Sequence, residues 1–426
     1  MAETELRGLS RRAAWAGGEK LISRLMDEAL HRPDLVSLAA GFVDQQTLPV
    51  EATQQALQTL WSHPARARAA LQYGTTIGHR PLREAILAHM IAADGPGSNR
   101  HLPTLEQIVV TAGSNQLLHL LADTLLDPGD IVLSAAPSYF VFLATLANVG
   151  ARTVGVAIDD QGIIPAALEA ELARREAAGE LARVKAIYVT TYYDNPTGIT
   201  TTESRRKDLI KIARCWSREN TIYLIEDAAY RELRYYGDDV PSLFALDEAG
   251  EQVIHAGTFS KSFSPGIRVG WGVLPKRLVR PLLSQKGNVD FGSPHFTQVL
   301  MAGLLEEGLF QQHAADLRAS YRAKLDATLA AADKFLKPLG VAWVRASGGL
   351  YVWLALPQKL DTALGGPLFQ RAVVEGMLYV PGDCCFPLEG FACPRNMIRL
   401  SFGVPSIADI VRGVESLSRA IQAFVP

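Results

Sequence analysis

The chain is poor in the features that mark several classes of protein, beginning with cysteine. Its 426 residues include four cysteines, and no two of them form a CxxC pair. Four are too few for a disulfide scaffold, and the spacing of thiol metal sites and redox motifs is missing. We therefore expect free thiols and no metal site. The four positions are Cys215, Cys384, Cys385 and Cys393.

An excess of charge of one sign is missing as well. Lys and Arg number 42 against 44 for Asp and Glu, so the formal net charge is -2. This balance gives no electrostatic footprint for nucleic acid or an anionic membrane. No apolar run approaches the ~20 residues that span a bilayer, and the N-terminus lacks the apolar core of a signal peptide. We expect a cytoplasmic protein with small-molecule partners and neither nucleic acid nor membrane.

What the chain does have, from about residue 105, is a regular alternation of short β-branched runs and longer amphipathic stretches. This alternation is typical of βα units that feed a mostly parallel sheet. Helical spacing of leucines predicts a helix after Gly113, and a charged amphipathic segment predicts another over 203–219. The predicted strands are Ile108–Thr111, Ile131–Leu133, Ala186–Thr191, Ile222–Glu226, Val253–Thr258 and Val269–Leu274.

The pattern changes around residues 305–335 to a long helical stretch rich in Ala and Leu. Beyond it, strands are predicted over Val341–Arg345, Tyr351–Leu356 and Met397–Phe402, with a closing helix over 407–424. We predict an α/β protein: a large domain with a mostly parallel sheet, and a smaller α+β C-terminal domain. The expected division is an N-terminal arm and part of the small domain (1–50), the large domain (51–305), and a linking helix with the small domain (306–426).

A lysine stands among hydroxyl groups where the strand over 253–258 ends. Thr258, Ser260 and Lys261 are followed by Arg268. An amine flanked by hydroxyls and a nearby guanidinium suits a phosphate ester that also presents an aldehyde to the amine. Alone, Lys261 could equally be an exposed loop lysine.

Three further segments also follow predicted strands, where open α/β sheets build their ligand crevice. Asp227, with Tyr230 close behind, could hold a pyridinium nitrogen protonated, or could simply cap a helix. Asn195 could bind a phenolic oxygen of the same ring, although Asn-Pro with a Gly soon after is also a common turn. Gly113, Ser114 and Asn115 open a helix whose free N–H groups attract anions, unless they only cap it.

Together these segments resemble the fold-type I pyridoxal-phosphate (PLP) enzymes, the class I/II aminotransferases, and within them the branch of aromatic, kynurenine and 2-aminoadipate aminotransferases. The resemblance covers nearly the whole chain, with the motifs in the family's order. The matching stretches are Leu38 to Gly41, Gln72 to Gly74, Thr111 to Gln116, Pro137 to Tyr139, Asn195 to Gly198, Asp227 to Tyr230, Thr258 to Arg268 and Ile398 to Phe402.

The resemblance implies a role for each of these residues. Lys261 would carry PLP as a Schiff base and later move protons, Asp227 would pair with the pyridine nitrogen, and Tyr139 would stack on the ring. Asn195 and Tyr230 would bind the ring oxygen, and Arg399 would grip the substrate carboxylate near Gly41 and Asn195. The phosphate would lie among Gly113, Ser114, Asn115, Thr258, Ser260 and Arg268, with Tyr73 supplied by the neighbouring subunit of a homodimer.

These roles predict a ping-pong transfer of the amino group of an L-amino acid to a 2-oxo acid. A lyase or cyclase that uses the same lysine and aspartate is an alternative, because fold alone does not fix function. The ligand-sensing domain of a transcription regulator is a more remote one, since only about 35 residues precede the matching region and the chain is not basic. Arg399 could also be a surface arginine beside Asp409.

The chain departs from the family near the expected substrate mouth. It has Ala40 where the family often has glycine, Asp194 where glutamine is usual, and Ala228-Ala229 where Asp-Pro is frequent. The stretch 42–46, Phe-Val-Asp-Gln-Gln, replaces one that usually contains proline. None of these changes removes a catalytic group. They leave the natural amino donor and acceptor undetermined.

Overall fold

The computed structural model of the protein describes residue 8 and residues 10–16, 34–95 and 100–425. Part of the predicted N-terminal arm (1–7, 9 and 17–33) therefore lies outside the described residues. The largest element is an eight-stranded sheet. Its strands, in spatial order, are β2 (Ile108–Thr111), β9 (Gly270–Val273), β8 (Val253–Thr258), β7 (Tyr223–Asp227), β6 (Val184–Thr190), β3 (Ile131–Ala136), β4 (Arg152–Asp159) and β5 (Gly162–Ile163).

This sheet is mostly parallel, as predicted. Strands β8, β7, β6, β3 and β4 run parallel to one another, and β2 points the same way because antiparallel β9 lies between it and β8. Only β9 and the short edge strand β5 run in the opposite direction. The carboxyl ends of six strands therefore meet at one edge, which places the segments that follow them side by side.

Helices cover both faces of the sheet, because side chains that alternate along each strand are buried on opposite sides. On β6, Ile187 belongs to the core under α5, α8, α9 and α12, whereas Tyr188 belongs to the core under α6, α7 and α11. The bounds are α5 (Arg80–Asp94), α6 (Ser114–Leu125), α7 (Phe140–Asn148), α8 (Pro165–Ala177), α9 (Glu203–Trp216), α11 (Lys276–Asp290) and α12 (His295–Glu306).

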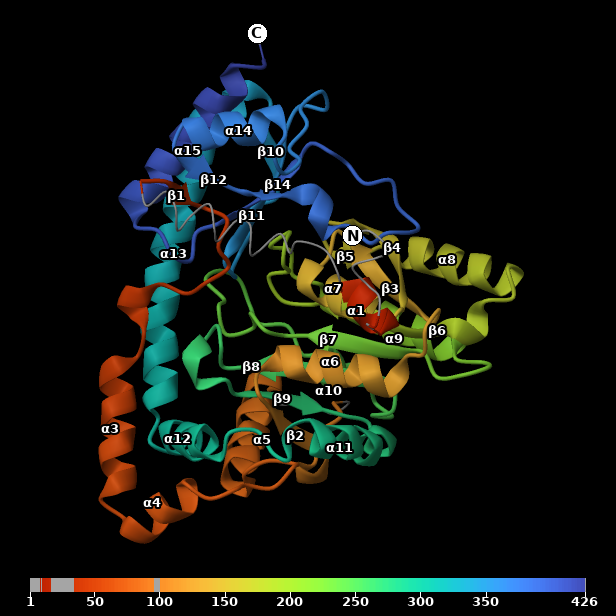
Figure 1. Ribbon diagram of the computed structural model, residues 1–426, viewed down its shortest axis with the longest axis vertical. Helices are drawn as coiled ribbons and strands as arrows, with labels where there is room; N and C mark the ends of the chain where they lie inside the picture. The colour runs from red at the N-terminus through yellow and green to blue at the C-terminus, as the bar shows by residue number, and fades with distance from the viewer. Residues whose placement is uncertain (1–7, 9, 17–33, 96–99, 426) are drawn as a thin grey trace.

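A second, antiparallel sheet is built by the C-terminal part of the chain. Its order is β10 (Ala342–Trp343), β11 (Tyr351–Ala355), β14 (Met397–Ser401) and β13 (Val380–Pro381). Nearby, β1 (Val36–Ser37) pairs in parallel with β12 (Met377–Leu378). Figure 1 shows the long helix α13 (Leu309–Phe335) running from α12 to this second sheet. There α15 (Ile407–Gln422) packs against α13. The remaining helices are α1 (Arg11–Ala16), α3 (Val50–Trp61), α4 (Pro64–Ala70), α10 (Leu243–Leu246) and α14 (Pro367–Val374).

The long helix predicted around residues 305–335 is α13, which begins at Leu309 because Gly308, with φ +74, separates it from α12 in a conformation that suits glycine. One predicted strand needs correction. The strand predicted over Val341–Arg345 is only Ala342–Trp343, since β11 pairs with those two residues alone. The domain boundaries near residues 50 and 305 stay a prediction. Among the described residues, no helix is both long and apolar enough to cross a membrane.

Candidate active site

A pocket of about 260 Å³ opens at the carboxyl edge of the large sheet. It lies where β2, β3, β6, β7 and β8 end, so segments far apart in the sequence contribute side chains to one place. Four of its residues were not predicted as site residues: Phe42, Thr190, Ala229 and Pro265. The other lining residues were all predicted, and they are Ser114, Asn115, Tyr139, Asn195, Asp227, Tyr230, Thr258, Ser260, Lys261 and Arg268.

Lys261 extends into this pocket from the turn after β8. Its ammonium nitrogen donates a hydrogen bond to the carbonyl oxygen of Gly41 at 2.7 Å. Burial lowers the pKa of Lys261, Tyr351 opposes this shift, and the cations Arg399 and Arg268 add to it. A lysine with a lowered pKa presents more of the neutral amine, which is the form that acts as a nucleophile or a base. The exposed loop lysine that the sequence left open is thereby excluded.

Asp227, the last residue of β7, is a buried carboxylate with 4% of its surface exposed. It accepts hydrogen bonds from the hydroxyl of Tyr188 at 2.9 Å and from the backbone N–H of Ala229 at 3.1 Å. Burial raises its pKa despite these two donors. Within the described residues Asp227 has no ion-pair partner. A cationic ring nitrogen would therefore complete its surroundings.

Arg399 lies on β14 of the second sheet and is 3% exposed, so it is not a surface arginine. Its guanidinium donates to Asn195 Oδ1 at 2.8 Å and to the carbonyl oxygen of Ala39 at 3.0 Å. Its buried Nε has no hydrogen-bond partner among the described residues. A planar guanidinium with a free N–H is suited to a carboxylate.

Tyr351, which sequence reasoning missed, joins this group from the start of β11. Its ring lies 4.4 Å from the guanidinium carbon of Arg399, and its hydroxyl lies 3.0 Å from that of Tyr230. Asn195 donates to Tyr230 at 3.4 Å. The two sheets thus meet in one hydrogen-bonded group, with Asn195 between the predicted ring-oxygen site and the predicted carboxylate site.

The start of α6 has the features of an anion site. Gly113 is its N-cap residue, with φ +83 and no side-chain hydrogen bond to the helix. A Cβ on Gly113 would lie 2.7 Å from a terminal nitrogen of Arg268, so only glycine permits this guanidinium to approach so closely. Arg268 also contacts Ser260 Oγ at 3.4 Å, and Thr258 Oγ1 lies 3.0 Å from Ser260 Oγ. Helix dipole, hydroxyls and guanidinium together suit a phosphate.

Of the remaining predicted site residues, two lie at the pocket and one does not. Tyr139 is the N-cap residue of α7 and lines the pocket, where burial raises the pKa of its hydroxyl. Gly41 offers its carbonyl to Lys261, and a Cβ at this position would lie 2.7 Å from the hydroxyl of Tyr351. Tyr73, in contrast, is 81% exposed and contributes nothing to the pocket lining of its own chain.

Asp194 yields a prediction about stability. Burial raises the pKa of Asp194 to about 6 from a usual value of 3.8, although hydrogen bonds from Thr197 lower it. Because folding disfavours the charged form, this carboxyl weakens the fold as the pH rises past the unfolded pKa, and the full penalty applies above about pH 6. We expect Asp194→Asn to raise Tm at about pH 8 and to have little effect at about pH 4. Thermal unfolding at both values checks this, and an equal effect at both would contradict it.

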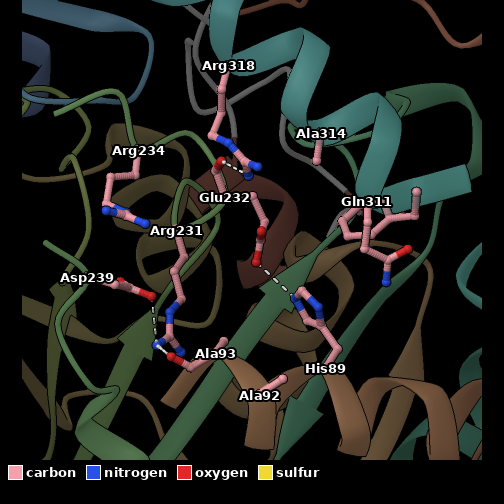
Figure 2. A pocket seen from close by; sticks show the side chains of 11 residues that line it. His89, Ala92, Ala93, Arg231, Glu232, Arg234, Asp239, Gln311, Ala314 and Arg318 are labelled. Atoms are coloured by element: carbon pink, nitrogen blue, oxygen red, sulfur yellow. Dashed lines mark hydrogen bonds and ion pairs between the residues drawn. The ribbon is translucent and has the colours of Figure 1, made fainter. Parts of the chain in front are cut away.

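A larger cavity, of about 440 Å³, lies outside this group of residues, beside α5 and α13. Figure 2 shows His89 facing Glu232 and Arg231 facing Asp239 across this cavity. The first pair is 2.8 Å apart and the second 3.3 Å. Arg231 also pairs with Asp94 at 2.9 Å. These charged side chains already have partners within the protein. The larger volume of this cavity is therefore not enough to make it the candidate active site.

Known proteins are similar to the chain over nearly its full length. The family model for aminotransferase class I and II matches residues 33–417. Aromatic-amino-acid aminotransferase 1 of Thermococcus litoralis is 34% identical over 91% of this chain and 88% of its own length. The 2-aminoadipate transaminase of Thermus thermophilus is 34% identical over 92% of both. The structure of Pyrococcus horikoshii kynurenine aminotransferase superimposes with a TM-score of 0.88 at 31% identity, covering 99% of this chain and 98% of that one.

These matches support amino-group transfer, not the lyase or regulator alternatives. They also agree with the fold, which has a large mixed sheet with helices on both faces and a smaller second sheet. The chain is an enzyme of the transferase class and belongs to the class I and II aminotransferases.

Proposed function

We propose that the enzyme uses PLP, held in the pocket by Lys261 and Asp227, to move the amino group of an L-amino acid to a 2-oxo acid. The observation that carries the proposal is the placement in one pocket of a half-buried amine and a buried carboxylate that has no ion-pair partner among the described residues. The cofactor is further supported by the similar P. horikoshii enzyme, which was solved in complex with PMP.

The residues present fit this cofactor at three points. The anion site at the start of α6 suits its phosphate, Asp227 suits its ring nitrogen, and Asn195 with Tyr230 suits its ring oxygen. Tyr139 lines the same pocket and would cover a ring face. When bound, PLP supplies an electron sink that stabilises a carbanion at the α-carbon of an amino acid.

The protein's own groups then have distinct tasks. The amine of Lys261, whose pKa is lowered by burial and by nearby cations, would accept the α-proton of the donor and, in the second half of the exchange, give a proton to the α-carbon of the new amino acid. Arg399 grips the α-carboxylate and thereby fixes which bond of the α-carbon faces the ring. Burial raises the pKa of Asp227 and so disfavours its charge, but a cationic ring nitrogen beside it would stabilise the carboxylate, which would in turn hold the proton on that nitrogen.

A screen of amino acids against several 2-oxo acids tests the proposal. We expect a new amino acid to form from the added oxo acid in amounts that match the 2-oxo acid released by the donor. Release of a 2-oxo acid and ammonia without a new amino acid would indicate an elimination and would overturn the proposal.

We also propose that two copies of the chain share their active sites through Tyr73. Its exposed ring packs edge-on against Phe291 at 5.7 Å between ring centres. Three further apolar residues are also more than half exposed: Leu71, close to Tyr73 in the sequence, Phe291, which contacts the Tyr73 ring, and Val289, two residues before Phe291. Exposed apolar side chains gathered in this way favour a protein partner.

Complementation checks this shared site. Lys261→Ala and Tyr73→Ala proteins should each be impaired, the second at limiting PLP. A coexpressed mixed dimer, isolated by two affinity tags, should regain activity, because one of its two sites has both native residues. A mixed dimer no more active than the Tyr73→Ala parent would contradict the proposal.

A further inference from the structure

A buried ion pair lies behind the pocket mouth and takes no part in the chemistry described above. Lys324 on α13 donates to Asp44 Oδ2 at 2.7 Å, and the two residues are only 5% and 9% exposed. The ammonium group also donates to the carbonyl oxygens of Gly403 at 3.0 Å and Val404 at 3.3 Å. All three of its hydrogens thus have acceptors, so the charge is fully paired in the interior.

This pair joins three parts of the chain. Asp44 belongs to the stretch 42–46, which begins with the pocket residue Phe42. Its backbone N–H donates to the hydroxyl of Tyr321 on α13 at 3.0 Å, and its side chain accepts from the N–H of Gln46 at 3.0 Å. Gly403 and Val404 form the turn just after β14, the strand that carries Arg399.

Phe42 lies between this pair and the catalytic lysine. Two contacts hold the backbone around Phe42: the N–H of Asp44 donates to the hydroxyl of Tyr321, and a Cβ on Gly403 would lie 2.6 Å from the carbonyl oxygen of Phe42. The side chain of Phe42 lines the pocket, and the residue is 51% exposed. An exposed aromatic ring held at a pocket mouth gains by covering an apolar group of the ligand.

We propose that Lys324 is a positioning residue: through Asp44 and Gly403 it sets the position of Phe42 relative to Arg399, and thereby sets the preference for ligands that carry a large apolar side chain next to their carboxylate. This inference rests on the proposed function in identifying Arg399 as the carboxylate site and PLP as the cofactor of the protein that is tested.

The test compares ligand binding in the PLP-loaded protein and in the double variant Asp44→Asn/Lys324→Met. Removing both charges avoids an unpaired buried ion, which a single substitution would leave. Calorimetry with 3-phenylpropionate and with propionate gives the binding ratio without any turnover. We expect the native protein to favour 3-phenylpropionate by about tenfold or more, the scale of discrimination in an apolar subsite, and the variant to lose most of that preference. A native protein without a preference, or a folded variant that keeps it, would overturn the proposal.

A cycle with Phe42→Ala separates positioning from general destabilisation. The triple variant Phe42→Ala/Asp44→Asn/Lys324→Met combines all three changes. If the ion pair acts through Phe42, this variant should bind 3-phenylpropionate no more weakly than Phe42→Ala alone. Additive losses would show that the pair acts elsewhere. Glu171→Gln/Arg175→Met is the matched control: this pair on α8 is 2.6 Å apart and 11% and 4% exposed, and its loss should lower Tm without changing the binding ratio.

Turnover of phenylalanine and alanine gives a second readout of the same ratio. We expect the double variant to raise KM for phenylalanine with little change in kcat, and to leave alanine nearly unaffected. A protein that shows the binding preference but transfers no amino group would refute the proposed function and leave the role of Lys324 standing.

Discussion

Replacing Lys261 with alanine is expected to lower turnover by ~10⁴-fold or more, because in the proposed function this one side chain supplies both the attachment for the cofactor and the base for the α-proton. The amine lies in the pocket with a lowered pKa, and the described residues that line the pocket include no other lysine. Steady-state rates measure the loss. Borohydride reduction followed by peptide mass spectrometry should find the phosphopyridoxyl group on Lys261 in the native protein and nowhere in the variant.

The matched control is Lys207→Ala, since that lysine lies on α9 with 60% of its side chain exposed. It should keep native activity and native labelling. Normal turnover in Lys261→Ala, or labelling of another lysine in the native protein, would refute the assignment of Lys261.

Replacing Asp227 with asparagine is expected to lower the rate by ~10³-fold while PLP stays bound. Asparagine keeps the size of the side chain and an oxygen for the hydroxyl of Tyr188, but it carries no charge to hold the ring nitrogen protonated. The phosphate site and Lys261 are untouched, so retention of the cofactor, measured by its absorbance after gel filtration, should change little.

Asp239→Asn serves as the comparison, because Asp239 lines the larger cavity and does not contact the pocket around Lys261. It should leave the rate unchanged. An Asp227→Asn protein with native turnover would show that the charge of Asp227 is not used. A variant that fails to retain PLP would show that the charge of Asp227 is needed to hold the cofactor, contrary to this prediction.

Much of the large sheet could be predicted because its strands are short β-branched runs between helical stretches. The strand Val253–Thr258 has the bounds that the sequence predicts, and β2 does as well. Parallel strands also explain why the site could be predicted: Asp227 ends a strand, and Lys261 and Ser114 come shortly after one, so the topology brings them to one edge. Local sequence therefore carries the part of the site that lies at strand ends.

The missed residues are those whose role depends on contacts between distant segments. Tyr188 is an ordinary aromatic residue of a buried strand, and only the pairing of β6 with β7 brings its hydroxyl to Asp227. Tyr351 is 121 residues from Tyr230 in the sequence, yet their hydroxyls lie 3.0 Å apart. Lys324 reads as one polar position on a long helix. Its burial follows from the packing of α13 against the stretch that contains Asp44.

The most direct test of amino-group transfer is a single exchange with no acceptor present. The PLP-loaded protein is mixed with an amino acid whose amino nitrogen is isotopically labelled, and the cofactor is then released and analysed by mass spectrometry. We predict that the cofactor carries the labelled nitrogen as an amine, with one equivalent of 2-oxo acid released per site. A cofactor recovered as the unlabelled aldehyde, with the labelled nitrogen released as ammonia, would contradict transfer.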